Sequence, residues 1–268
     1  MTDAEELAGY IAVWKRSVDD FIALMEEVPA AEWSRTTDLE GWDVHAVVAH
    51  IAHLEALLAG ARHDELEIGE PPHVKSPMGI FTEQGVVARR DRTPDELLDE
   101  IRAAVRSRAA ALDAAPPTDG SVPAPGLFGA IGWNQRTLLR NRPLDVWMHE
   151  QDVRRAIGRP GNLDGPAAHH VSSYLMESLG FAVAKRAGAP AGTTVVLEVD
   201  GVGTTAVRVN DSGRAEQVEP PADPTVRLAM PVADHVVLAG GRSAPADVRI
   251  GGDRDLADRI LAVMGVTP

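Results

Sequence analysis

The spacing of apolar residues predicts helices through the first 160 residues of the chain. Over residues 4–28, apolar side chains recur at intervals of three and four positions, which places them on one face of a helix. The same periodicity predicts helices over residues 43–62, 93–115 and 134–157, and residues 78–90 are compatible with a short helix. Four long helices that each carry one apolar face are expected to pack as a bundle around a common core.

Capping signals support two of these helix starts. Asp43 is a suitable N-cap, and Thr93-Pro94-Asp95-Glu96 combines threonine at the N-cap, proline at the first helical position and glutamate at the third. Residues 116–132 are rich in proline and glycine, which predicts a long loop. Pro143 is expected either to kink the following helix or to lie in its first turn.

The pattern changes near residue 160. A helix is predicted over residues 165–187, followed by β-branched stretches and then by short elements that close the chain. The stretches cover residues 193–199, 204–209 and 224–228, with turn signals at Asp200-Gly201 and at residues 210–213; a helix over 232–239, a strand over 247–250 and a helix over 253–264 follow. We therefore expect an α+β chain with a helical domain over residues 1–160 and an α/β domain over residues 161–268.

The charge balance and hydropathy of the chain exclude several classes of partner. A formal net charge of −14 argues against a general nucleic-acid surface, which needs concentrated basic residues, and against binding to anionic membranes. No run of about 18 apolar residues is present, and the acidic N-terminus lacks the apolar stretch of a signal peptide. We expect a cytoplasmic protein that acts on a small molecule.

The chain contains no cysteine. It therefore has no disulfide, and no protein thiolate can serve as nucleophile or as metal ligand. Any sulfur chemistry must use a thiol supplied from outside the protein.

Three polar residues stand out on the predicted helices as candidate metal ligands. Asp145 and His149 are four residues apart, so their side chains lie one above the other on the same helix face. His50 projects from the apolar face of the helix over residues 43–62, whereas His45 and His53 lie on other faces of that helix. Two imidazoles and one carboxylate form the ligand set of a catalytic zinc-type site, because a coordination position stays open.

A simpler interpretation of these residues stays open. His50 could be a surface histidine or a hydrogen-bonded core residue. Asp145 and His149 could form a solvent-exposed pair among their charged neighbours, which are Arg142, Glu150, Arg154 and Arg155. Asp152 is either a hydrogen-bond partner of a metal ligand or a surface residue.

The segments around these residues resemble a known family. Gly41-Trp42-Asp43-Val44, followed by Val48-Ala49-His50-Ile51, is similar to the N-terminal signature of the mycothiol-dependent maleylpyruvate isomerases. Residues 145–154, Asp-Val-Trp-Met-His-Glu-Gln-Asp-Val-Arg, resemble the second signature of that family. The resemblance extends in order and length over nearly the whole chain.

This resemblance implies a DinB/YfiT-like four-helix bundle followed by a C-terminal domain similar to sterol-carrier folds. It also implies that His50, Asp145 and His149 bind a divalent metal, usually zinc, and that mycothiol is the co-substrate. The isomerase type carries glutamate where this chain has Asp145. Because aspartate is one methylene shorter, the metal would sit closer to the helix, or the helix would shift.

The implied reaction is attack by a metal-activated thiolate on a small electrophile. Reversible addition to a conjugated double bond would give a cis–trans isomerase, and a retained adduct would give a thiol S-transferase. By the same resemblance Arg242 is a candidate catalytic arginine. The alternatives are a metal-dependent hydrolase and a non-catalytic protein that binds a small ligand and has a structural metal or none.

Four further residues near these segments are given structural roles. Trp42 and Trp147 are expected to pack in the core, and Arg89 and Arg90 to lie on the surface.

Overall fold

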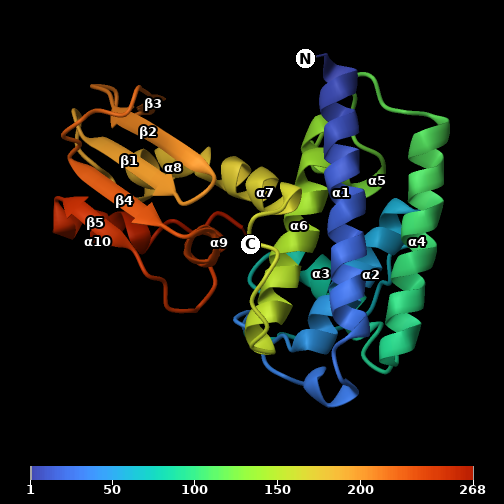
Figure 1. Cartoon of the computed structure of the whole chain (residues 1–268). Helices are drawn as coiled ribbons and strands as arrows, with labels where there is room; N and C mark the ends of the chain where they lie inside the picture. The colour runs from blue at the N-terminus through green and yellow to red at the C-terminus, as the bar shows by residue number, and fades with distance from the viewer. Residues whose placement is uncertain (1, 268) are drawn as a thin grey trace. The chain divides into compact units, whose positions relative to one another are not determined.

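A computed structural model describes residues 2–267 and divides the chain into two compact units after Gly161. The first unit contains only helices, and the second combines helices with one sheet (Figure 1). The helices of the first unit are α1 (Asp3–Glu26), the short η1 (Ala30–Glu32), α2 (Val44–Leu58), α3 (Pro77–Val87), α4 (Pro94–Ala114), α5 (Gly126–Ala130) and α6 (Gln135–Ala156).

The predicted four-helix bundle is formed by α1, α2, α4 and α6. Helix α1 packs on α6 and α4, while α2 packs on α4 and α6, so the four helices enclose one core. Helix α3 packs on the outside of α2. Apolar residues from all four helices fill the core, among them Trp14, Phe21, Val47, Ile51, Leu97, Ile101, Val146 and Val153. None of the helices in the described residues is long and apolar enough to cross a membrane.

The predicted helix starts are confirmed by their caps. The Asp43 carboxylate accepts a hydrogen bond of 2.8 Å from the Ala46 amide at the start of α2. Thr93 and Glu96 form a reciprocal capping box at the start of α4. Asn134 caps α6 in the same way, with 2.8 Å between its Oδ1 and the Thr137 nitrogen.

Of the two alternatives for Pro143, a place in the first turn is excluded, because Pro143 lies in the interior of α6. Two other sequence-based expectations about secondary structure need correction. The segment expected to be a loop over residues 116–132 contains α5, which buries Phe128. The single helix expected over residues 165–187 is instead α7 (Pro166–Met176), α8 (Leu179–Phe181) and the π-helical η2 (Ala182–Arg186). Ser178 explains the break after α7, because its hydroxyl donates to the Leu175 carbonyl at 2.6 Å.

The second unit contains a five-stranded mixed sheet of order β3-β2-β1-β4-β5. Its strands are β1 (Thr194–Val199), β2 (Gly203–Val209), β3 (Ala215–Gln217), β4 (Val226–Met230) and β5 (Arg249–Gly252). Helix α9 (Val232–Ala239) connects β4 to β5, and α10 (Arg254–Leu261) follows β5. Strands β1 and β4 are parallel, and the other neighbours are antiparallel. The sequence pattern misses β3, because this three-residue edge strand is largely exposed and shows no apolar alternation.

His235 on α9 gives a testable pH dependence of stability. The side chain is fully buried, neither ring nitrogen has a hydrogen-bond partner among residues 2–267, and burial lowers the pKa of His235 to about 4. In the unfolded chain His235 takes up a proton near pH 6.5, whereas in the folded chain it does so only near pH 4. The free energy of unfolding therefore decreases as the pH falls from about 6.5 toward 4. Urea unfolding at pH 7 and pH 5 is expected to show that His235→Leu removes about 2 kcal/mol of this loss. An equal loss in both proteins would contradict the assignment.

Candidate metal centre

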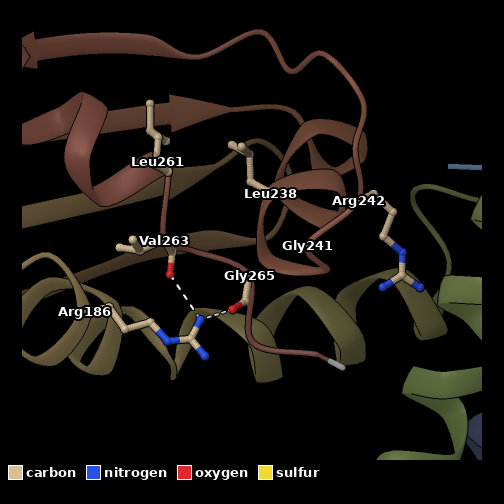
Figure 2. Close-up of a pocket in the computed structure, with 8 residues that line it drawn as sticks. Arg186, Leu238, Gly241, Arg242, Leu261, Val263 and Gly265 are labelled. Atoms are coloured by element: carbon tan, nitrogen blue, oxygen red, sulfur yellow. Dashed lines mark hydrogen bonds between the residues drawn. The ribbon is translucent and has the colours of Figure 1, made fainter. Parts of the chain in front are cut away.

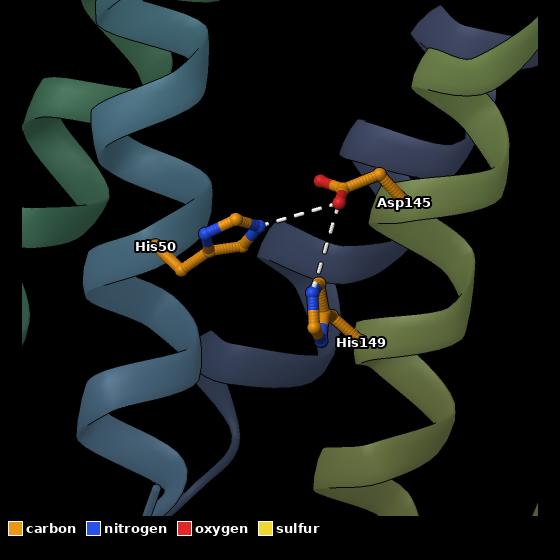
Figure 3. A group of neighbouring side chains, drawn as sticks. All are labelled: His50, Asp145 and His149. Carbon is orange, nitrogen blue, oxygen red and sulfur yellow. Dashed lines mark hydrogen bonds and ion pairs between the residues drawn. The ribbon is translucent and has the colours of Figure 1, made fainter. Parts of the chain in front are cut away.

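Helices α2 and α6 bring the three predicted ligands together inside the bundle. His50 extends from α2 toward Asp145 and His149, which lie one turn apart on α6 (Figure 3). The Asp145 Oδ1 atom lies 3.2 Å from His50 Nε2 and 3.7 Å from His149 Nε2. One ligand atom from each residue lies within 4.8 Å of the other two. This convergence is what a single bound cation requires.

The cluster is enclosed but reachable by solvent. Both imidazoles are buried, whereas the Asp145 side chain is 25% exposed. An external ligand could therefore approach on the side of the carboxylate. The solvent-exposed pair considered as an alternative for Asp145 and His149 is wrong, because their neighbours Arg142 and Glu150 are also buried.

Asp152 fixes the orientation of one imidazole. Its Oδ2 atom lies 3.0 Å from His149 Nδ1, and the carboxylate is completely buried. A hydrogen bond to Nδ1 leaves Nε2 of the same ring available for a metal, which is the usual arrangement for a metal-binding histidine. Of the two roles considered for Asp152, the structure therefore supports the hydrogen-bond partner.

Arg142 holds the second oxygen of Asp145. Its Nη1 donates to Asp145 Oδ2 at 3.0 Å, and its Nη2 donates to Glu55 Oε1 at 2.7 Å. Glu55 is completely buried on α2 and also accepts from Trp14 Nε1 at 3.0 Å and from Arg108 Nη1 at 3.4 Å. The two guanidinium groups and the two carboxylates balance each other in charge inside the bundle.

This environment sets the protonation of the cluster. Burial lowers the pKa of His50, which favours the neutral imidazole that binds metals. Burial alone would raise the pKa of Asp145, but the hydrogen bond with His50 and the Arg142 guanidinium outweigh it and hold that pKa well below its usual range. A neutral imidazole beside an ionised carboxylate is the protonation state in which these residues coordinate a divalent cation.

Both tryptophans pack on the core as the sequence predicts, and Trp42, which is only partly buried, also lies beside the cluster. Trp147 is completely buried. The Trp42 ring is half-buried, with its centroid 5.1 Å from that of His50 and 6.0 Å from that of His149. Trp42 therefore packs against both imidazoles of the cluster.

One expectation about a charged residue is wrong, and one histidine outside the cluster is buried. Arg89 is buried and not a surface residue, because it pairs with Glu100 at 2.7 Å and with Asp64 at 2.9 Å, whereas Arg90 is exposed as expected. His53 is also completely buried, although it does not share the face of His50. Helix α3 covers that other face of α2, so both faces are interior.

His53 belongs to a separate set of hydrogen bonds. Its Nε2 lies 3.1 Å from His63 Nδ1, and His63 Nε2 lies 2.9 Å from Gln84 Oε1. The His63 ring stacks on Phe81 with a centroid distance of 4.0 Å. These contacts tie the loop after α2 to α3, and among the described residues they do not form a second cluster of three metal-binding groups.

Glu55 is the residue of this region that sequence reasoning missed. It follows His50 by five positions on a helix whose remaining residues are almost all apolar. A carboxylate within such a segment is a signal of a buried ion pair, since carboxylates are almost never fully buried unless they are paired.

Arg242, the predicted catalytic arginine, lies in the second unit and is not part of this cluster. It follows α9, and its Nη1 donates to the Gly240 carbonyl at 2.6 Å and to Thr267 Oγ1 at 3.0 Å. Arg242 lines a pocket of about 480 Å³ together with Arg186, whose guanidinium donates to the carbonyls of Val263 and Gly265 (Figure 2). Two cationic side chains thus border one pocket of the second unit.

The three residues of the cluster fit a divalent metal chemically. Two imidazole nitrogens and one carboxylate oxygen form a mixed donor set, and Asp145 Oδ1 faces both rings while Oδ2 is occupied by Arg142. The fold and the cluster together define an α+β protein with a candidate metal centre in an N-terminal four-helix bundle.

Comparison with known proteins identifies the family. Residues 14–154 match the family model of the mycothiol maleylpyruvate isomerase N-terminal domain, and residues 166–259 match that of the corresponding C-terminal domain. The chain therefore belongs to the mycothiol-dependent maleylpyruvate isomerase family, which confirms the resemblance seen in the sequence. A search of curated proteins found no match.

Two solved structures share the fold. One is a mycothiol-dependent maleylpyruvate isomerase, with 20% sequence identity and a TM-score of 0.56 over 94% of this chain and 95% of that chain. The other is a histidine-to-alanine mutant of a mycothiol-dependent maleylpyruvate isomerase, with 19% identity and a TM-score of 0.56 over 92% of this chain and 95% of that chain. At this identity the likeness establishes the α+β fold of the chain.

Proposed function

We propose that the protein is a metal-dependent enzyme that uses mycothiol as a nucleophile on a small electrophilic substrate, as a cis–trans isomerase or a thiol S-transferase. The observation that carries this proposal is the convergence of His50, Asp145 and His149 inside the domain that matches the isomerase family. The absence of cysteine agrees with it, because the nucleophilic sulfur must then come from a small thiol.

The three side chains would hold the metal through His50 Nε2, His149 Nε2 and Asp145 Oδ1, and we expect zinc. A metal bound there would lower the pKa of a coordinated thiol and act as a Lewis acid toward the substrate. Asp152 keeps His149 Nε2 available by engaging Nδ1. Arg142 holds Asp145 Oδ2, so that Oδ1 is directed at the imidazoles.

Arg242 is proposed as the cation that binds a substrate carboxylate. Its place on the border of a pocket that also contains Arg186 supports a role in anion binding. This assignment rests on the family resemblance of the segment around Arg242.

Metal analysis followed by a thiol-dependence assay tests the proposed function. The purified protein, expressed with added metal, is expected to contain zinc and to convert an electrophile from a panel of conjugated acids only when mycothiol is added. A chelator should abolish conversion, and zinc should restore it. Metal-dependent conversion without a thiol would contradict the proposal in favour of a hydrolase, and a metal-free protein that only binds ligands would contradict it in favour of a binding protein.

A further inference from the structure

The two imidazoles of the cluster are held in different ways. His149 is oriented by the hydrogen bond between its Nδ1 and Asp152. His50 Nδ1 is buried, and no hydrogen-bond partner for it exists among residues 2–267. Because metal-binding imidazoles usually engage a second group that fixes the ring, some other contact must orient His50.

Trp42 supplies that contact. Its ring lies against His50 with a centroid distance of 5.1 Å and an interplanar angle of 42°. The neighbouring residue Asp43 caps α2, so the backbone that carries Trp42 is anchored at the start of the helix that carries His50. Contact with a rigid indole restricts rotation of a buried imidazole even without a hydrogen bond.

Trp42 is itself anchored to α3. Its Nε1–H donates to Glu83 Oε2 at 2.9 Å, and the same oxygen lies 3.1 Å from His73 Nε2. Glu83 is buried, so this shared carboxylate is shielded from competing water. The indole is therefore held both by α3 and by the loop that precedes it.

Gly41 shows how closely this arrangement is packed. A Cβ atom at this position would lie 2.3 Å from His73 Nδ1, and the backbone has a φ of +82°, which favours glycine. His73 thus sits directly on the backbone next to Trp42. A larger residue at position 41 would displace His73 from Glu83.

We propose that Trp42 is the positioning residue for His50 and that Glu83 and His73 hold Trp42 in place, so that α3 and the loop before it tune the metal affinity of the cluster. This inference rests on the proposed function, because it requires metal binding by His50. The His50 imidazole then depends on packing for its orientation, whereas the His149 imidazole depends on a hydrogen bond.

Zinc affinity, measured by competition with a chromogenic chelator, tests the proposal without an activity assay. Trp42→Ala is expected to weaken zinc binding about tenfold, as loss of a group that orients a metal ligand does. Glu83→Gln should weaken it by a smaller factor, and so should Trp42→Phe, which keeps an aromatic ring but lacks the N–H that donates to Glu83. Asp152→Ala is the positive reference, and Trp133→Phe is the matched control, because Trp133 packs in a separate apolar cluster.

The visible spectrum of the cobalt-substituted protein provides the second readout. Glu83→Gln is expected to change its ligand-field bands, because His50 takes a different orientation, whereas a purely structural role would leave the bands unchanged. If Trp42→Ala does not fold, the Glu83→Gln protein decides the question. The inference would be overturned if Glu83→Gln and Trp42→Ala kept wild-type zinc affinity and an unaltered cobalt spectrum while Asp152→Ala bound zinc more weakly. The proposed function would still stand in that case. A wild-type protein that binds no zinc would overturn the proposed function as well.

Discussion

Replacing His149 with alanine is expected to remove metal binding and, with it, thiol-dependent activity. His149 supplies one of only two imidazoles in the cluster, and its Nε2 and Asp145 Oδ1 are 3.7 Å apart, close enough to bind one ion together. Loss of a group that merely hydrogen-bonds to a ligand costs about 10- to 100-fold in metal affinity, so loss of the ligand itself should cost more. Elemental analysis of the purified protein, combined with zinc titration, measures the effect.

His45 provides the matched control for this experiment. It lies on α2, as His50 does, but its Nε2 contacts the Arg92 carbonyl at 2.8 Å and it takes no part in the cluster. His50→Ala should lose the metal as His149→Ala does, whereas His45→Ala should retain it. Equal metal content in all three variants would show that the bound ion lies elsewhere.

Glu55→Gln is expected to destabilise the bundle by about 3–5 kcal/mol, because removing one partner of a buried ion pair leaves an uncompensated charge. Burial alone would raise the pKa of Glu55, but Arg142 and Arg108 overcome it and keep the carboxylate ionised. Glutamine has nearly the same shape and no charge, so Arg108 would lose the carboxylate with which it pairs, and Arg142 would keep only Asp145. Urea unfolding at pH 7 measures the change in free energy.

The control is an exposed ion pair between α1 and α4, the two helices that carry Trp14 and Arg108. Lys15 and Asp113 are 2.8 Å apart, and the Asp113 side chain is 68% exposed. Asp113→Asn should therefore cost no more than about 1 kcal/mol. If Glu55→Gln costs no more than Asp113→Asn, the buried network is not what stabilises this end of the bundle.

Much of the candidate site can be predicted from the local sequence pattern. The spacing of Asp145 and His149 places both on one helix face whatever the rest of the fold does, because the period of a helix is a local property. The caps at Asp43 and Thr93 are local for the same reason, and the structure confirms both. The predicted bundle, the α+β fold class and the family also follow from the sequence.

Tertiary structure decides which polar residues are buried and what they contact. His53 lies on a different face of α2 from His50, yet both side chains are buried, because α3 covers a second face of the helix. The pairing of Glu55 with Arg142 joins residues 87 positions apart, and no local pattern encodes such a contact.

The sequence by itself thus determined the four long helices of the first unit, the caps at Asp43 and Thr93 and the identity of the three candidate ligands, because each depends on spacing within a single element. Only the tertiary structure decided that Asp152 orients His149, that Trp42 packs on His50, and that Arg142 holds Asp145. The contacts of Trp42 and the ion pair of Arg142 with Glu55 depend on how separate helices meet, and that packing is set by the whole core rather than by neighbours in the chain.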